Sequence, residues 1–370
     1  MTSSSGPASG PEDPSRSLDS LPPSTALTGL SRSQFLRRGL AAGAALSAVG
    51  LVPEQAFATR TRPEAPHLPP GFSDIFTTRY VNAGAVRLHA VVGGEGPPLL
   101  LVHGWPQNWY QWRLIMPALA QQFRVIAVDQ RGMGLSQKPP DGYDTGTLAR
   151  DLVGLMDALG HERFTLAGFD TGLDISYALA ADYRGRVERL VVGEAPIPGV
   201  TTSPPLFVSG QYVPVFFHLL FNRLTHMNVD LVRGRESIFF GFVFDAEAAN
   251  KLPEYAVRFY IDGFASSREA LTGSFGWYRA WDATTAQNLE RIKRKLSVPV
   301  LAIGGEFALG EGVAETMRLV ASDVQGLVIP GSGHFIAEEA PEAVLAALRT
   351  FLAPYRDGHA TRATSRRAAK

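Results

Sequence analysis

The chain has 370 residues, of which 45% are hydrophobic and 19% are charged, the balance of a folded protein with a large core. Its 35 basic and 35 acidic residues cancel, so no net field favours nucleic acid or an anionic membrane as a partner. The sequence contains no cysteine, which excludes a disulfide framework, a thiolate metal site and a cysteine nucleophile.

The first 58 residues have the composition of an export segment. Residues 1–30 are rich in Ser, Pro and Gly and are expected to be disordered. Basic residues then precede the apolar run Gly39–Val52, and small residues flank Phe57 at the end of the segment. This order predicts a signal peptide cleaved after Ala58, with an apolar run too short to span a membrane. Because Ser33 replaces one arginine of a twin-arginine motif, the twin-arginine and general secretion routes stay open, as does a lone amphipathic helix.

From residue 72 onward, short apolar runs alternate with helical patterns. This alternation predicts an α/β fold with a mostly parallel sheet and helices on both faces. The expected strands are Val86–Val92, Leu99–Val102, Val125–Val128, Phe164–Ala167, Leu190–Val192, Val298–Ile303 and Leu327–Ile329. The expected helices are Thr145–Leu159, Ile175–Ala181 and Glu342–Leu352.

The strand pattern stops over residues 199–290, where aromatic residues are frequent and the spacing is helical. A helical insertion after one strand, followed by a return of the strands, is typical of a cap over an active site. We therefore expect a linker at 59–71, a core formed by 72–198 and 291–353, a helical cap at 199–290 and a disordered basic tail at 354–370.

The strongest chemical signal is the sequence Gly-Phe-Asp-Thr-Gly at residues 168–172, directly after an expected strand. This is the pattern of a sharp strand-to-helix turn that presents a nucleophile, here Asp170. A carboxylate with a pKa near ~3.9 is ionised without the help of a base, and it suits displacement at the saturated carbon of an epoxide or alkyl halide. The alternative is an aspartate that only caps the next helix.

Two further loops follow expected strands. In the sequence His-Gly-Trp-Pro at 103–106, we expect the backbone N–H of Trp105 to form an oxyanion hole together with that of Thr171, and we expect His103 to anchor the loop. The sequence Gly-Ser-Gly-His at 331–334 follows the last strand. His334 is therefore the expected general base that activates water.

A histidine base needs a carboxylate that fixes its tautomer. Glu306 and Glu311 follow the penultimate expected strand, whereas Glu194 lies at the end of the strand before the insertion. Their positions favour Glu194 and leave Glu306 open.

The motifs HGWPQNWYQW, DQRGMGLSQKP, GFDTG and GSGH resemble, in this order, the epoxide hydrolase branch of the α/β-hydrolase superfamily. The resemblance extends from about residue 72 to residue 352 and is strongest to the secreted Cif-type epoxide hydrolases. It implies hydrolysis of epoxides to vicinal diols through an aspartyl ester. In that group the glutamate of the EAPIP segment is the charge-relay acid, and this glutamate matches Glu194. A histidine and a tyrosine of the cap hold the epoxide oxygen in that group, and they match His218 and Tyr278.

Two similar families provide the alternatives. Haloalkane dehalogenases have tryptophan directly after the nucleophile, where this chain has Thr171. Fluoroacetate dehalogenases have arginines just after the nucleophile turn, where this chain has Leu173–Ser176. A haloalkane or haloacid dehalogenase that uses Asp170 is therefore the second hypothesis, and a non-catalytic ligand-binding protein is the third.

The expected partners are a small epoxide and water. Neither a cofactor nor a metal is expected, because no histidine pair has a ligand spacing beside an acid. Nucleic acid and a stable membrane span are not expected either. The oligomeric state is left open, with a homodimer as one alternative.

Overall fold

The computed structural model describes residues 64–368, with side chains described through residue 359. The predicted export segment at 1–58 and its cleavage point lie outside the described residues. Among the helices of residues 64–368, none combines the length and apolarity that a membrane crossing requires.

The described residues contain an 8-stranded sheet in the order β1-β2-β4-β3-β5-β6-β7-β8. The strands β3 to β8 run parallel, and β1 and β2 form an antiparallel edge. The prediction of a mostly parallel sheet is therefore confirmed. The bounds are β1 Phe76–Asn82, β2 Arg87–Gly93, β3 Pro98–Val102, β4 Arg124–Val128, β5 Phe164–Phe169, β6 Val187–Gly193, β7 Val300–Gly305 and β8 Val324–Ile329.

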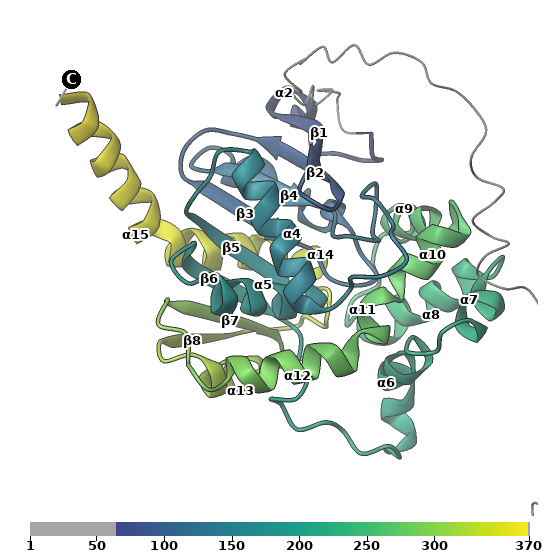
Figure 1. The fold of residues 1–370 in the computed structure, drawn as a ribbon. Coiled ribbons are helices and arrows are strands. Elements are labelled where there is room, and N and C mark those ends of the chain that lie inside the picture. Colours follow the sequence, from purple (N-terminus) through teal and green to yellow (C-terminus); the bar gives the residue numbers. More distant parts are fainter. Residues whose placement is uncertain (1–63, 369–370) are drawn as a thin grey trace, which may run out of the picture. The chain divides into compact units, whose positions relative to one another are not determined.

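Helices cover both faces of the sheet, with α4 and α5 in front of it and part of α15 behind it in Figure 1. Their sequences explain their limits: the side chain of Asp144 accepts a hydrogen bond of 3.0 Å from the N–H of Thr147 and caps α4. The bounds are α2 Phe72–Ile75, α3 Met116–Leu119, α4 Thr145–Ala158, α5 Thr171–Asp182, α13 Gly312–Val320, α14 Ile336–Glu339 and α15 Pro341–Ala368, with a 3₁₀ helix η1 at Trp109–Trp112.

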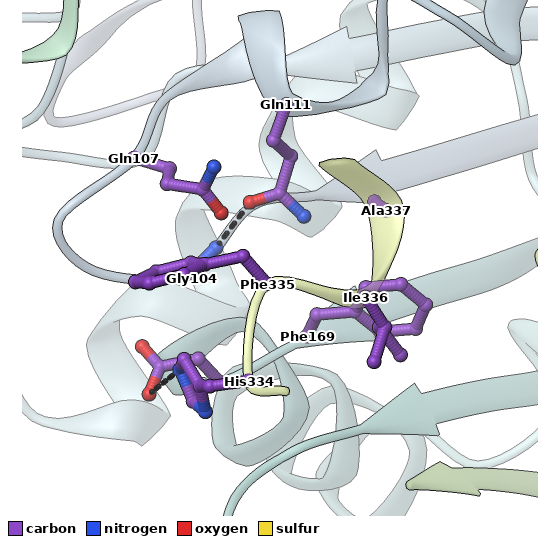
Figure 2. Close-up of a pocket in the computed structure, with 9 residues that line it drawn as sticks. Gly104, Gln107, Gln111, Phe169, His334, Phe335, Ile336 and Ala337 are labelled. Carbon is purple, nitrogen blue, oxygen red and sulfur yellow. Dashed lines mark hydrogen bonds and ion pairs between the residues drawn. The ribbon is translucent and has the colours of Figure 1, made fainter. Parts of the chain in front are cut away.

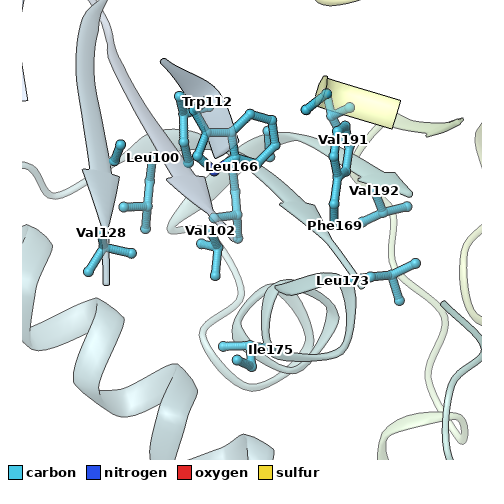
Figure 3. Close-up of a cluster of buried hydrophobic side chains, with 14 of the residues drawn as sticks. Leu100, Val102, Trp112, Val128, Leu166, Phe169, Leu173, Ile175, Val191 and Val192 are labelled. Carbon is cyan, nitrogen blue, oxygen red and sulfur yellow. The ribbon is translucent and has the colours of Figure 1, made fainter. Parts of the chain in front are cut away.

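The core lies between the central strands and the helices that cover them. Figure 3 shows apolar side chains from β3 to β6 packed beside α5 and the ring of Trp112. Strands that are covered on both faces have continuous apolar sequences rather than alternating ones, as in β3 and β5, whose residues are all buried. This packing holds the carboxyl ends of β3, β5 and β6 at one rigid edge, where the candidate site residues lie.

Between β6 and β7 the chain is helical, as the aromatic-rich spacing of residues 199–290 predicts. We call residues 199–290 the helical insertion. Figure 1 shows α6 to α11 in teal and green beside one edge of the sheet. The bounds are α6 Val213–Phe221, α7 Met227–Val232, α8 Glu236–Glu247, α9 Glu254–Ala265, α10 Arg268–Ser274, α11 Gly276–Arg279 and α12 Trp281–Arg291, with a 3₁₀ helix η2 at Gly210–Tyr212.

The expectation of a disordered tail from residue 354 is wrong for the described residues, because α15 continues to Ala368. The proline at 354 and the polar composition hid this continuation in the sequence. The reason is tertiary: Tyr355 is 4% exposed, and its hydroxyl donates a 2.9 Å hydrogen bond to the carbonyl of Pro98 at the start of β3. That contact fixes the helix directly after Pro354, which lacks the N–H of an ordinary helical residue.

Candidate active site

Asp170 occupies the turn between β5 and α5, where the motif predicts it. Its φ of 53° lies in the left-handed region, which is uncommon for a residue other than glycine and is typical of strained functional sites. The flanking glycines are required by close approach: a Cβ at Gly168 would lie 2.2 Å from the carbonyl oxygen of Gly172, and one at Gly172 would lie 2.5 Å from that of Val102. The turn therefore lifts Asp170 above the end of the sheet.

Two backbone N–H groups face the carboxylate of Asp170. The N–H of Trp105, on the loop after β3, donates to Oδ1 at 2.6 Å, and the N–H of Thr171 also donates to this carboxylate. The pKa of Asp170 is raised above its usual value, because burial raises it by more than the charge of His334 and these two N–H groups lower it. The structure thus brings together the two groups predicted for an oxyanion hole.

His334 lies on the loop after β8, between two carboxylates. Its Nε2 is 3.6 Å from Oδ2 of Asp170, and its Nδ1 is 3.6 Å from Oε2 of Glu194. Burial disfavours the charged form of His334. The hydrogen bond with Glu194 and the charges of Glu247, Asp170 and Glu194 outweigh burial and raise the pKa of His334 to about 10.

Of the candidate relay acids, the structure places Glu194 beside His334. Glu194 has a φ of 59°, and its carboxylate accepts hydrogen bonds from the N–H groups of Gly305 at 2.5 Å and Leu309 at 3.4 Å. Glu306 instead accepts a 2.8 Å bond from the N–H of Gly331 at the exposed rim. The strained turn at Glu194 points its side chain across β7 toward the histidine loop.

His218 of α6 and Tyr278 of α11 meet over Trp105. The rings of His218 and Trp105 are stacked with centroids 5.1 Å apart, and Tyr278 lies edge-on to both, at 5.2 Å from Trp105 and 5.6 Å from His218. Burial and the charge of His334 lower the pKa of His218 to about 3. Burial and the nearby Asp170 and Glu247 raise the pKa of Tyr278 well above its usual value. Both side chains are therefore neutral at neutral pH.

The sequence analysis missed Glu247, the last residue of α8. Its Oε1 is 3.3 Å from Nδ1 of His218 and its Oε2 is 3.8 Å from Nε2 of His334, with only 6% of the side chain exposed. A signal was present: Phe240, Val243 and Phe244 are buried, and Glu247 continues their stripe on one face of the helix. An acid on an apolar stripe is a candidate for a buried function.

A small cavity borders Asp170 and His334, whose side chains are 22% and 16% exposed. In Figure 2 the segment after β8 faces the loop after β3 across this cavity, and Gln111 accepts a hydrogen bond from the N–H of Gly104. The lining residues are Gly104, Gln107, Gln111, Phe169, Asp170, His334, Phe335, Ile336 and Ala337.

His103 has the geometry of a loop anchor. Its Nε2 accepts a 3.1 Å hydrogen bond from the N–H of Gln130, so the proton is on Nδ1, which donates to the carbonyl of Gly104 at 2.8 Å. The ring thereby joins the loops after β3 and β4 beneath the backbone that reaches Asp170.

Known proteins are similar to this chain over nearly all of the described residues. A family model described as the alpha/beta hydrolase fold matches residues 97–341. The soluble epoxide hydrolase of Corynebacterium sp. (strain C12) is 34% identical over 73% of this chain and 95% of its own length. The fluoroacetate dehalogenase of Burkholderia sp. is 31% identical over 76% of this chain and 96% of its own.

Among solved structures, Cfl2 from Burkholderia cenocepacia matches with a TM-score of 0.74 and 34% identity, covering 79% of this chain and 99% of that one. The epoxide hydrolase CorEH matches with a TM-score of 0.68 and 31% identity, covering 76% and 99%. The family match covers most of the chain, and the relatives match over nearly their whole length. The chain belongs to the α/β-hydrolase fold family and, within it, to the epoxide hydrolases.

Proposed function

We propose that the chain hydrolyses epoxides to vicinal diols through a covalent ester on Asp170. One observation carries the proposal: the nucleophile has two backbone N–H donors on one side, with that of Trp105 at 2.6 Å from Oδ1, and His334 at 3.6 Å from Oδ2 on the other. A carboxylate held in this way can attack a saturated carbon, and the resulting ester lies beside a base that can activate water.

In the first step an oxygen of Asp170 attacks one epoxide carbon, the ring C–O bond breaks and an alkoxide forms. His218 and Tyr278 are the proposed neutral donors to that oxygen, supported by their burial and their contacts with the ring of Trp105. Donors that are fixed in a site without water stabilise a developing charge more strongly than water does. We assign the helical insertion the role of a cap that supplies these donors, as in the Cif-type group.

In the second step His334 takes a proton from water, and the hydroxide attacks the carbonyl carbon of the ester. The N–H groups of Trp105 and Thr171 would then hold the oxyanion. Glu194 would keep the histidine proton on Nδ1 and stabilise the imidazolium. Collapse of the tetrahedral intermediate releases the diol and restores the Asp170 carboxylate.

A dehalogenase is the second candidate, because the indole N–H of Trp105 is buried and has no hydrogen-bond partner within the described residues. Such a donor could hold a halide. A haloacid is disfavoured by Asp174, a fully buried acid four residues after the nucleophile whose pKa is raised well above its usual value by burial and by Asp170. It offers no positive charge to a substrate carboxylate.

Export and assembly complete the proposal. The signal-like sequence supports cleavage after Ala58 and release outside the cytoplasm by either export route.

A homodimer is supported by exposed apolar side chains on the insertion: Leu220, Met227, Leu231 and Ile238 are all more than half exposed. Amino-terminal sequencing of the exported protein, which we expect to begin at Thr59, and sedimentation test these two points.

A single turnover in ¹⁸O-water tests the reaction. With excess enzyme and 1,2-epoxybutane, the ester route places ¹⁸O in the carboxyl group of Asp170 and leaves the diol with unlabelled oxygen. We expect mass spectrometry of the peptide that contains Asp170 to show this label. Label found in the diol alone would mean direct attack by water and would overturn the ester mechanism, and a panel of epoxides and alkyl halides without any turnover would support a ligand-binding protein.

A further inference from the structure

We propose that Glu247 relays a proton from His334 to His218 during ring opening, so that one proton transfer both neutralises the alkoxide and frees the base for the second step. The inference rests on the proposed function and adds a residue that acts through two others. Glu247 contacts the two histidines rather than the reacting atoms.

The position of Glu247 supports this assignment. It ends α8 and faces His218 with Oε1 at 3.3 Å and His334 with Oε2 at 3.8 Å, so each carboxyl oxygen serves one ring. Its own backbone carbonyl accepts a 3.0 Å hydrogen bond from the N–H of His334. A small rotation closes the longer gap, or one water molecule bridges it. A rotation of the carboxyl group would also bring Oε1 into line with Nδ1 of His218, which has no hydrogen-bond partner among the described residues.

The proton balance of ring opening requires such a connection. The alkoxide takes a proton from the ring of His218, which takes one at Nδ1 from Oε1 of Glu247. Glu247 then takes one at Oε2 from the imidazolium of His334. The net change is one proton moved from His334 to the alkoxide, which leaves the ring proton of His218 on Nδ1 and the carboxyl proton of Glu247 on Oε2.

Ester hydrolysis closes the cycle. The neutral His334 takes a proton from water, the hydroxide adds to the ester, and the leaving oxygen takes its proton from that hydroxyl group. Asp170 ends as a carboxylate, His334 as an imidazolium and the product as a diol. Before the next turnover the carboxyl group of Glu247 rotates to turn its proton back toward His218, and His218 returns to its first tautomer by exchange with water. No net proton enters or leaves the site.

The strong basicity of the alkoxide drives the transfer, and the charges in the site keep both Glu247 and His334 protonated until the alkoxide forms. Burial raises the pKa of Glu247 to about 8, with repulsion from Asp170 and Glu194 adding to the shift and the charge of His334 opposing it. Glu247 is therefore protonated at neutral pH, whereas His334, with a pKa raised to about 10, is charged. Esterification removes the charge of Asp170, which raises the pKa of both His334 and Glu247. Both groups therefore hold their protons less firmly when the alkoxide forms.

The titratable groups around Glu247 come from several elements. They are His218 of α6, Tyr278 of α11, Asp170 after β5, Glu194 after β6 and His334 after β8. Glu339 of α14 lies at the same junction, but the hydrogen bonds that its carboxylate accepts all come from backbone N–H groups. The donors are Gly333, Phe335, Ala249 and Asn250. Glu247 is thus the carboxyl group that connects the two histidine rings.

The test is Glu247→Gln, which keeps the size of the side chain and the backbone bond to His334 but cannot relay a proton. Asp245→Asn is the matched control, since Asp245 is an exposed acid on the same turn of α8. Ester formation is followed by rapid quench and mass spectrometry with 1,2-epoxybutane, epichlorohydrin and trifluoromethyl oxirane, whose alkoxides are progressively less basic. The histidine rings are titrated by ¹⁵N NMR without substrate.

We expect Glu247→Gln to slow ester formation roughly 100-fold with 1,2-epoxybutane, the low end for loss of a positioned acid, and much less with trifluoromethyl oxirane. The pKa of His334 should fall in the variant, because Glu247 loses its proton near pH 8, below the pH at which His334 titrates, and its charge then raises the pKa of His334. Asp245→Asn should match the wild type in both measurements. Equal slowing for all three epoxides, or an unchanged titration of His334, would overturn the relay. Wild-type protein that forms no ester would instead refute the proposed function.

Discussion

The two sides of the site are held in different ways. On the core side, Asp170 and Glu194 sit at strand ends in left-handed backbone conformations, and backbone N–H groups hold their carboxylates. On the insertion side, His218 and Tyr278 are held by ring contacts with Trp105 and are neutral. In the proposed mechanism, the core side supplies the charges that make and break the ester, and the insertion supplies neutral donors to the substrate oxygen.

The comparison predicts that loss of a core group stops a defined chemical step. The largest effect is expected for Asp170→Asn, because an amide is a poor nucleophile and no other carboxylate reaches the same position. Turnover should fall by at least about 10⁴-fold, and mass spectrometry should find no epoxide adduct. An adduct on another residue of this variant would show that the nucleophile is wrongly assigned.

His334→Gln should separate the two steps. Hydrolysis of the ester needs the base, whereas attack by Asp170 needs none and, for one turnover, can draw on the proton that Glu247 already carries. We expect turnover to fall by roughly 10³- to 10⁴-fold while the ester accumulates to nearly one per enzyme. Intact-protein mass measured seconds after mixing reports this directly. If the variant shows neither adduct nor turnover, the two-step scheme is incorrect.

Glu194→Gln should slow hydrolysis of the ester by roughly 10³-fold, less than the 10⁴-fold seen for a triad aspartate, and its formation far less. The hydrogen bond and charge of Glu194 raise the pKa of His334, so the variant should have a lower pKa at that histidine. Because the neutral form of His334 is the base, the rising limb of the pH profile should move to lower pH. Glu306→Gln is the comparison, and the assignment fails if that variant alone reproduces both effects.

Changes on the insertion side should be smaller and should depend on the substrate. Tyr278→Phe removes one donor and nearly preserves volume, so epoxide opening should slow by roughly 10²-fold, as for loss of one oxyanion donor. His218→Phe should act in the same direction, and the double variant should form little ester. Alkyl halides, whose leaving groups need little protonation, should be affected weakly. A wild-type preference for halides that survives Tyr278→Phe would identify a dehalogenase.

Local sequence was sufficient for the elements whose conformation is set by neighbouring residues. The turn at Asp170 and the loop at His334 could be located because glycines flank them and apolar strands precede them. The choice between Glu194 and Glu306 depends on the order of β6, β7 and β8 in the sheet. It also depends on the left-handed backbone conformation of Glu194, which the sequence does not indicate because the residue is not a glycine.

Glu247, β1 and the second half of α15 depend on contacts between distant segments. The partners of Glu247 lie on α6 and after β8, and β1 has a mixed burial pattern because it forms the edge of the sheet. The residue of α15 that is anchored, Tyr355, bonds to the carbonyl of Pro98, which lies 257 residues earlier in the chain. Periodicity within a single window of sequence can place Glu247 on a buried face of its helix, but it carries no signal for the distant residues that these segments contact.

The hydrogen bond from the N–H of His334 to the carbonyl of Glu247 has a consequence for protein engineering. A chimera that keeps this core but receives a foreign insertion would alter the support of the catalytic base along with the substrate pocket. Foreign insertions whose last turn of α8 presents a backbone carbonyl at the same point would keep the N–H of His334 hydrogen-bonded. Those that do not would trap the ester, even with every core residue unchanged.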